Sequence, residues 1–218
     1  MRFVDGRVLP IRKIVCVARN YRSHAAEMGA AVPEAPVFFL KPATAVIHDG
    51  ETIVLPPQSE DVQVETELAV ILTGGGKDVP ESEAMRLVGG YAVFFDITAR
   101  DLQAAAKKAG LPWTASKGFD TFAPIGDAVP VTAILDPATL HITLHVNGQV
   151  RQDAPTSDMV FGVPRLIHSA SHIMRLEEGD ILATGTPSGV CTITAGDSLD
   201  ATIPGLPRLH SRVTRTSG

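Results

Sequence analysis

Cysteines, basic charge and long apolar runs are scarce in this sequence, and each scarcity excludes a class of protein. Two cysteines among 218 residues cannot form the disulfide framework of a small secreted domain, so we expect a reducing, cytoplasmic location. No apolar run reaches membrane-spanning length, and we expect no secretion signal at the N-terminus. A net charge of −5 provides no basic surface for nucleic acid or anionic lipid. Nucleic acid and membrane are therefore not expected as partners.

What the sequence does contain predicts a packed, turn-rich globular protein. Hydrophobic residues make up 44% and charged residues 20%, which is typical of a chain with a substantial core. The 19 glycines and 16 prolines are scattered, which predicts many turns and short strands. The length suits one large domain or two small ones.

An acidic pair interrupts the segment 62–72, which otherwise has the composition of a buried strand. Glu65 and Glu67 lie two residues apart, so on a strand both side chains point to the same face. Two carboxylates directed toward a core are costly unless a positive group lies between them, and a hard divalent cation prefers such oxygen ligands. The alternative is an exposed edge strand with a hydrated acidic face, and this segment alone does not decide between the two.

A third carboxylate, Asp96, lies near the end of a strongly apolar segment, 91–97, that also predicts a strand. Three acidic side chains from two strands form a plausible oxygen-rich cation site. The alternative role for Asp96 is to cap a predicted helix over 98–109, which Gly110 would end.

A short helix over 21–28 carries His24 and Glu27 three residues apart, with Asn20 as its expected N-cap and Gly29 at its end. A carboxylate beside an imidazole raises the basicity of the ring and fixes its tautomer, which suits a general base. The alternative is an ordinary surface pair.

Patterns elsewhere predict further elements. Asn147-Gly148 between alternating segments predicts a β-hairpin. Helices are expected over 81–88, ended by Gly89 and Gly90, and over 163–174 with a buried stripe, and strands over 181–183, 198–203 and 209–214.

Two local patterns resemble known sites but fail on inspection. His168 and His172 have zinc-binding spacing, yet no third ligand is indicated, so a structural or surface role is favoured. The run Gly74 to Lys77 lacks the glycine spacing and the hydroxyl residue of a phosphate-binding loop.

Five motifs in order resemble the fumarylacetoacetate hydrolase family, and together they cover most of the chain. They are VCVARNYRSHAAE at 15–27, ETEL at 65–68, FDITARDLQ at 95–103, SKGFD at 116–120 and GDILATGTP at 179–187. The segment 107–113 is most similar to the small acylpyruvase branch. The chain departs from the family pattern at Ala18, Val64 and Cys191. These departures remove no proposed ligand, although they are expected to reshape the pocket.

The resemblance implies an α+β fold, a β-rich mixed roll with peripheral helices, in a single catalytic domain spanning 1–218 that pairs as a homodimer. It also implies roles for particular residues. It implies Mg²⁺ or Mn²⁺ bound by Glu65, Glu67 and Asp96, catalytic roles for His24, Glu27 and Lys117, and substrate contacts from Arg19, Arg100, Gln103 and Thr186.

The activity that the resemblance implies is hydrolysis of the C–C bond of acylpyruvates, such as fumarylpyruvate or acetylpyruvate, to pyruvate and a carboxylate. The same site chemistry serves tautomerisation or decarboxylation of oxaloacetate, or isomerisation of a 2-hydroxyhepta-2,4-diene-1,7-dioate type of substrate, and all of these take a small 2-keto acid. A catalytically silent metal-binding protein is the alternative outside enzymes, and the intact set of His24, Glu27 and Lys117 argues against it.

Overall fold

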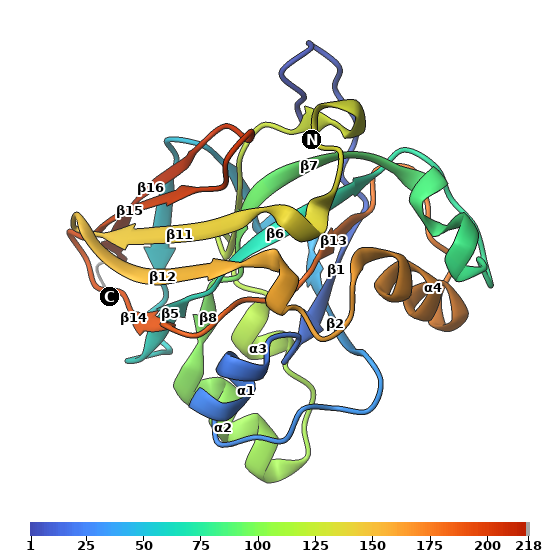
Figure 1. Ribbon diagram of the computed structural model, residues 1–218. Coiled ribbons are helices and arrows are strands. Elements are labelled where there is room, and N and C mark those ends of the chain that lie inside the picture. Colours follow the sequence, from blue (N-terminus) through green and yellow to red (C-terminus); the bar gives the residue numbers. More distant parts are fainter. Residues whose placement is uncertain (217–218) are drawn as a thin grey trace.

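The computed structural model describes residues 1–216, in which three β-sheets contain most of the regular secondary structure (Figure 1). The largest sheet has eight strands in the order β2-β1-β13-β6-β7-β9-β3, with β10 also paired to β7. Its strands are β1 (Lys13–Ala18), β2 (Val37–Pro42), β3 (Val46–His48), β6 (Thr66–Leu72), β7 (Val88–Phe95), β9 (Ala123–Ile125), β10 (Val129–Pro130) and β13 (Ile181–Ala183). Parallel and antiparallel pairs both occur, since β1 runs parallel to β13 and antiparallel to β2.

Two smaller sheets complete the β-structure. The five-stranded sheet has the order β12-β11-β15-β16-β4 and the three-stranded sheet has the order β14-β5-β8. Their strands are β12 (Gln149–Pro155), β11 (His141–Val146), β15 (Ser198–Thr202), β16 (Leu209–Arg215), β4 (Thr52–Leu55), β14 (Cys191–Thr192), β5 (Val62–Val64) and β8 (Thr98–Ala99). Val64 and Cys191, two of the departures from the family pattern, lie directly opposite each other on β5 and β14.

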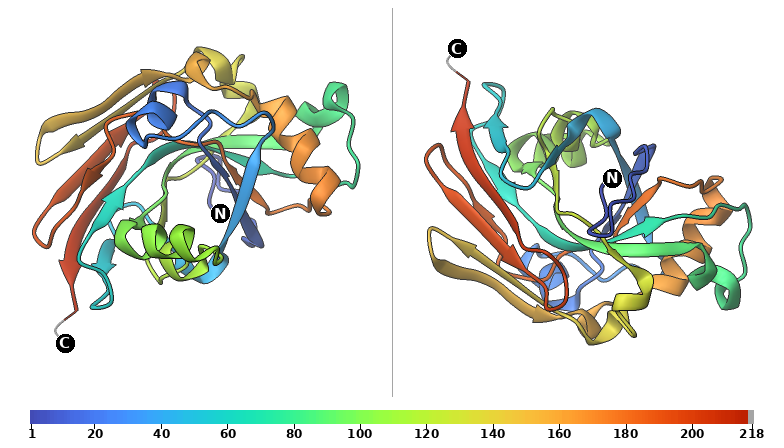
Figure 2. Two further views of the ribbon diagram at one scale, coloured as in Figure 1. Left: turned by 90° about the horizontal axis from the view of Figure 1, so that it is seen from below. Right: turned by 90° about the horizontal axis from the view of Figure 1, so that it is seen from above.

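The helices lie at the periphery, as expected for this fold (Figures 1 and 2). They are α1 (Arg22–Glu27), α2 (Arg100–Ala109), α3 (Thr114–Lys117) and α4 (Val163–Ile173), with short 3₁₀ segments at Ala43–Ala45, Glu81–Leu87, Val131–Ala133, Pro137–Thr139 and Thr156–Asp158. At the lower end of the molecule in Figure 1, α1 lies on one side and α2 with α3 on the other, which the view from below in Figure 2 shows clearly. No helix in the described part of the chain is long and apolar enough to cross a membrane.

The central strands β6 and β7 are buried along their whole lengths. Alternate residues of β6 face two different apolar clusters, with Leu68 and Val70 in one and Ala69 and Ile71 in the other. A strand buried on both faces has a continuous apolar sequence, which is why 66–72 and 88–95 contain so few polar residues. The polar residues Thr66 and Glu67 begin β6, and Asp96 directly follows β7. These residues belong to the site described below.

The segment 62–72 is not one strand, contrary to the prediction. The strand breaks at Glu65, so that β5 belongs to the three-stranded sheet and β6 to the eight-stranded sheet. At the break, the Glu65 carbonyl accepts a hydrogen bond of 2.8 Å from the backbone N–H of Asp96. The chain therefore passes from the three-stranded to the eight-stranded sheet at Glu65, where its backbone is bonded to that of Asp96.

The segment 81–88 also differs from the prediction. Glu81–Leu87 forms a 3₁₀ segment, and Gly89 and Gly90 lie inside β7 rather than ending a helix. A Cβ atom on Gly90 would lie 2.2 Å from the carbonyl oxygen of Val129 on the paired strand β10. The glycine there allows two backbones to approach closely, a second reason for glycine besides helix termination.

The remaining elements largely follow the sequence. The helix predicted over 98–109 begins only at Arg100, because Thr98 and Ala99 form β8, and it ends at Gly110 with φ of 66° as expected. The 141–155 hairpin is confirmed, with positive φ at both Asn147 and Gly148. The predicted strands over 181–183, 198–203 and 209–214 are present to within about one residue. The helix over 163–174 is present as α4, but its terminal Ile173 is 63% exposed and does not belong to the buried stripe.

Asn20 is not the N-cap of α1, which was a wrong prediction. Tyr21 occupies the cap position without a side-chain bond. The Asn20 side chain instead donates to the carbonyls of Thr184 (2.8 Å) and Phe161 (3.0 Å) and accepts from the Phe161 N–H (2.8 Å). Asn20 thus ties the end of β1 to two segments about 140 and 160 residues away.

We expect Asn20→Ala to lower the free energy of unfolding by about 2–4 kcal/mol, because it leaves a buried carbonyl and a backbone N–H without partners. Urea unfolding measures the loss. Gln149→Ala, in the exposed hairpin, is the control and should change stability by less than about 0.5 kcal/mol. An Asn20 variant as stable as this control would show that the three bonds do not hold the segments together.

Candidate active site

Three carboxylates meet at one end of the central strands. Glu65 lies between β5 and β6, Glu67 on β6, and Asp96 directly after β7. The antiparallel register places Glu67 opposite Phe94 and Thr66 opposite Phe95, which brings the start of β6 beside the end of β7. One ligand oxygen from each acid lies within 4.8 Å of the others, and each residue is at most 5% exposed. The structure thus brings the three predicted ligands together at distances that one coordination sphere can span.

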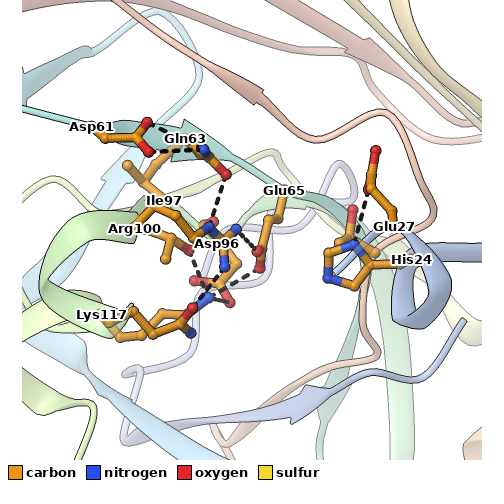
Figure 3. Close-up of polar contacts among 12 residues, drawn as sticks. His24, Glu27, Asp61, Gln63, Glu65, Asp96, Ile97, Arg100 and Lys117 are labelled. Carbon is orange, nitrogen blue, oxygen red and sulfur yellow. Dashed lines mark hydrogen bonds and ion pairs between the residues drawn. The ribbon is translucent and has the colours of Figure 1, made fainter. Parts of the chain in front are cut away.

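Lys117, on α3, pairs with two of the three acids of this cluster (Figure 3). Its Nζ lies 2.6 Å from Asp96 Oδ2 and 3.0 Å from Glu65 Oε2, and it also donates to Thr98 Oγ1 at 2.6 Å. Burial alone lowers the pKa of Lys117, but the carboxylates of Asp96 and Glu65 outweigh burial and raise this pKa above its ordinary value. Lys117 therefore stays protonated and holds two of the three acids in place.

A second buried lysine, Lys41 on β2, was not identified from the sequence. Its Nζ donates to the carbonyls of Ile97 (2.8 Å), Lys117 (2.7 Å) and Phe122 (2.8 Å), and it lies 2.9 Å from Asp96 Oδ1. An ammonium has three hydrogens, and the three carbonyls use all of them. Asp96 Oδ1 is consequently attracted by the charge but accepts no hydrogen bond within residues 1–216.

The sequence around Lys41 gives no sign of this role. Alternation along β2 would place the apolar Leu40 inside and the charged Lys41 outside, whereas in the structure Leu40 is exposed and Lys41 is buried. Only the packing of β2 against the segment after β7 shows it.

Arg100, at the first turn of α2, holds Glu65 from the other side. Its Nη2 forms an ion pair with Glu65 Oε1, while Nε donates to Gln63 (2.8 Å) and Nη1 to Gln103 (2.7 Å). Burial raises the pKa of Glu65, but Lys117 and Arg100 together hold it far below the ordinary value. Gln103 thus uses its amide oxygen to orient the guanidinium, and Glu65 is ionised and doubly paired.

Glu67 differs from the other two acids because no cationic side chain of the described residues pairs with it. Within residues 1–216, the hydrogen bond that its side chain accepts is from the backbone N–H of Gly185 at 2.7 Å. Burial, followed by the neighbouring carboxylates of Asp96 and Glu65, raises the pKa of Glu67 well above its ordinary value. A carboxylate that lacks a counter-charge, beside two others, marks the position where a divalent cation would be stabilised.

The donor set therefore fits a hard divalent cation. It consists of carboxylate oxygens alone, and both Glu67 and Asp96 Oδ1 have lone pairs that no side chain satisfies within residues 1–216. Oxygen-only ligands favour Mg²⁺ or Mn²⁺ over the softer metals.

His24 and Glu27 of α1 lie near the same cluster and face each other. His24 Nδ1 is 3.3 Å from Glu27 Oε2, and Glu27 Oε1 accepts a hydrogen bond of 2.9 Å from the Gly189 N–H. In Figure 3 these two residues lie on the opposite side of Glu65 from Lys117. Nδ1 is engaged by the carboxylate, so Nε2 is the ring nitrogen that is available to a substrate.

Thr186 is held by a residue that sequence reasoning missed. Its hydroxyl donates to the Thr66 carbonyl at 2.8 Å and accepts from Gln152 Nε2 at 2.7 Å. Gln152 is fully buried on β12, also donates to the Pro187 carbonyl (2.9 Å), and accepts from the Thr66 N–H (2.8 Å). Thr66 lies between the two acidic ligands, so Gln152 fixes the loop of Thr186 relative to the carboxylates.

A cavity of about 330 Å³ connects these groups. Eight of the ten residues predicted from the sequence line it. The other two each contact a lining side chain, Asp96 at 2.6 Å from Lys117 and Glu27 at 3.3 Å from His24. Arg19 lines the cavity with a backbone φ of 57°, a left-handed conformation that is unusual for arginine and typical of functional loops. The lining residues outside the predicted set include Phe39, Lys107 and Trp113.

A β-rich α+β fold with a curled sheet and peripheral helices is shared with solved structures. Fumarylpyruvate hydrolase from Pseudomonas aeruginosa, solved in complex with Mn²⁺ and pyruvate, superposes with a TM-score of 0.93 at 36% identity, covering 99% of this chain and 95% of that one. This similarity confirms the predicted fold class.

Residues 13–214 match the family model described as fumarylacetoacetate (FAA) hydrolase C-terminal, and the chain belongs to the fumarylacetoacetate hydrolase family. The mitochondrial oxaloacetate tautomerase FAHD1 of Arabidopsis thaliana is 49% identical over 203 residues, 93% of this chain and 91% of that protein. An uncharacterized protein of Pyrococcus horikoshii is 53% identical over 198 residues, 91% of this chain and 86% of that protein. The chain is thus a member of an enzyme family.

We expect Glu67→Gln to stabilise the metal-free protein and to abolish its stabilisation by Mn²⁺. The folded-state pKa of Glu67 lies above the ordinary value of 4.5, so the metal-free protein loses stability as the pH rises above that value, and a neutral amide removes this loss. Wild-type protein should gain about 2.7 kcal/mol at a Mn²⁺ concentration 100-fold above its Kd. Thermal unfolding with and without Mn²⁺, between about pH 5 and 8, measures both effects.

The matched variant Glu65→Gln should instead destabilise the metal-free protein, because Arg100 and Lys117 lose the carboxylate with which both are paired. If Mn²⁺ stabilises the Glu67→Gln protein as much as the wild type, Glu67 is not a ligand.

Proposed function

We propose that the protein is a divalent-metal-dependent enzyme that interconverts the keto and enol forms of small 2-oxo acids, with oxaloacetate as the leading substrate. The observation that carries this proposal is the convergence of Glu65, Glu67 and Asp96 within 4.8 Å beside an imidazole whose Nε2 is available for proton transfer. Removing a proton next to a ketone requires a base and a means to stabilise the resulting negative charge, and the site has candidates for both.

Mg²⁺ or Mn²⁺ is the proposed cofactor, with Glu65, Glu67 and Asp96 as its ligands. A divalent cation at these oxygens would supply Lewis-acid stabilisation of the enolate charge, an effect worth several kcal/mol. Three carboxylates and the three cations Lys41, Lys117 and Arg100 cancel, so the bound ion would leave the site positive and suited to an anion.

The side chains have separable proposed roles. His24 takes a proton from C3 of the substrate through Nε2, and the same proton is delivered to the C2 oxygen, so the reaction needs no further reactant. Glu27 holds the ring through Nδ1 and stabilises the imidazolium while the proton is on it. Lys117 adds positive charge next to the oxygens on which charge develops, and Arg19, Arg100, Gln103 and Thr186 orient the substrate or its supports.

Hydrolysis of an acylpyruvate is the second candidate function. In that reaction His24 takes a proton from water, the water oxygen attacks C4, the C3–C4 bond breaks, and C3 receives a proton, giving pyruvate and a carboxylate. The support is the TM-score of 0.93 to a fumarylpyruvate hydrolase. Tautomerisation is placed first because a relative at 49% identity has that name, whereas the hydrolase is 36% identical.

The test is a panel of oxaloacetate, fumarylpyruvate and acetylpyruvate, each assayed with Mg²⁺ and with Mn²⁺. We expect loss of the ultraviolet absorption of enol-oxaloacetate, with pyruvate release from the other two substrates if hydrolysis also occurs. If none of the three substrates is converted, the proposal is contradicted. A homodimer, a cytoplasmic location and a single domain over 1–218 stay predictions.

We expect His24→Ala to lower kcat by roughly 10²–10⁴-fold, the range for loss of a general base, while Mn²⁺ affinity stays at the wild-type value. Steady-state kinetics and Mn²⁺ titration by calorimetry measure the two effects. A fall in metal affinity would instead assign His24 to the metal site.

Glu27→Gln should lower kcat less than His24→Ala, by about 10-fold or more, because the base remains and only its orientation and charge stabilisation are lost. The Gly189 N–H can still donate to the amide oxygen, so α1 should keep its position. Unchanged kcat would mean that the His24–Glu27 contact has no catalytic role.

A further inference from the structure

Two cations line the cavity without a carboxylate to neutralise them. Lys41, Lys117 and Arg100 each pair with an acid of the cluster, but within the described residues neither Arg19 nor Lys107 has an acidic partner within 4 Å. Arg19 makes a single long hydrogen bond of 3.4 Å to the Ala31 carbonyl. The proposed mechanism assigns no role to Lys107 or to its positive charge.

Lys107 is held at the mouth of the cavity. It lies on α2, nearly two turns after Arg100, and its Nζ is 5.1 Å from the ring centroid of Trp113, which also lines the cavity. An ammonium over an aromatic face is attracted to it but keeps its hydrogens free to donate to a ligand. Trp113 therefore orients the cation without neutralising it.

The electrostatic surroundings of Lys107 are those of an anion site. Partial burial, followed by Arg100 and more weakly by Lys117 and Arg19, lowers the pKa of Lys107, and only Glu65 opposes them appreciably. Several cations that repel one another in one cavity are stabilised when an anion binds among them.

The acids and the unpaired cations occupy different depths. Glu65, Glu67 and Asp96 are buried at the floor, whereas Lys107 is exposed and Arg19 half-buried at the rim. A substrate whose carboxylate and C2 oxygen lie at the floor would place its other end at this rim.

We propose that Lys107, oriented by Trp113 and assisted by Arg19, binds the second carboxylate of a dianionic substrate. The inference rests on the proposed function, because that function places the 2-oxo acid end at the floor. It predicts that the enzyme prefers 2-oxo acids with a carboxylate at the end opposite the 2-oxo acid group, such as oxaloacetate and fumarylpyruvate. Acetylpyruvate, whose opposite end is neutral, is expected to be a poorer substrate.

The test compares two ligands that differ only at the far end. L-malate and L-lactate are both 2-hydroxy acids, but only malate has the second carboxylate. Their Kd values for the Mg²⁺-loaded enzyme are measured by calorimetry, with the fluorescence of Trp113, the one tryptophan in the sequence, as a second readout near the proposed contact.

Wild-type enzyme should bind malate at least tenfold more tightly than lactate. Lys107→Met should reduce this preference about tenfold, the size of one charge-assisted contact, and Lys107→Arg should retain most of it. Lys108→Met is the matched control: it removes the same charge from the next position of α2, which is also exposed and does not line the cavity. It should leave the preference unchanged. Arg19 is not substituted, because its left-handed backbone would confound the result.

Three results would overturn the inference: no preference for malate in the wild type, an equal effect of Lys107→Met on both ligands, or an equal loss of preference in Lys108→Met, which would indicate a general field effect. The substrate panel decides the proposed function independently. If the enzyme prefers malate through Lys107 but converts no 2-oxo acid, the result supports the anion site and contradicts the proposed activity.

Discussion

The burial of three carboxylates side by side is the constraint on which the rest of the site depends. Such a cluster is unstable without positive charge. The fold supplies this charge through Lys117 and Arg100 on Glu65, and through Lys117 and Lys41 on Asp96, and it leaves Glu67 with only a backbone N–H. This unequal distribution is what makes the cluster a candidate cation site, since a fully neutralised cluster would offer a divalent ion no advantage.

The site has a floor on the central strands and further groups supplied by helices and loops. The floor is built on β6 and β7, which are buried on both faces and hold the acids at fixed distances. The helices and loops supply His24 on α1, Lys107 on α2 and the loop that carries Thr186; His24 and Thr186 are buried, and Lys107 is exposed at the rim. The enolate stabilisation proposed for this floor would serve both tautomerisation and hydrolysis, the two activities for which relatives are named, and the outcome would depend on the groups around the floor.

The local features that the sequence predicted well are those that depend on near neighbours. The Asn147-Gly148 turn, the end of α2 at Gly110 and the His24–Glu27 pair are each set by residues within four positions. The errors arise where a distant strand competes with a local signal. Asn20 has the residue type of a helix cap but bonds to Thr184 and Phe161, and Gly90 has the residue type of a helix stop but accommodates β10.

The sequence by itself determined which side chains are available for chemistry. Three acids placed in or beside apolar segments have few stable states except beside positive charge, and this argument needs only local spacing and the cost of desolvation. Only the tertiary structure decided which groups supply that charge and hold the site. Lys41 reaches Ile97 across 56 positions and Gln152 reaches Thr66 across 86. Long polar side chains have no periodic pattern that reveals a distant partner, so their pairing is fixed by how the sheets pack and not by spacing along the chain.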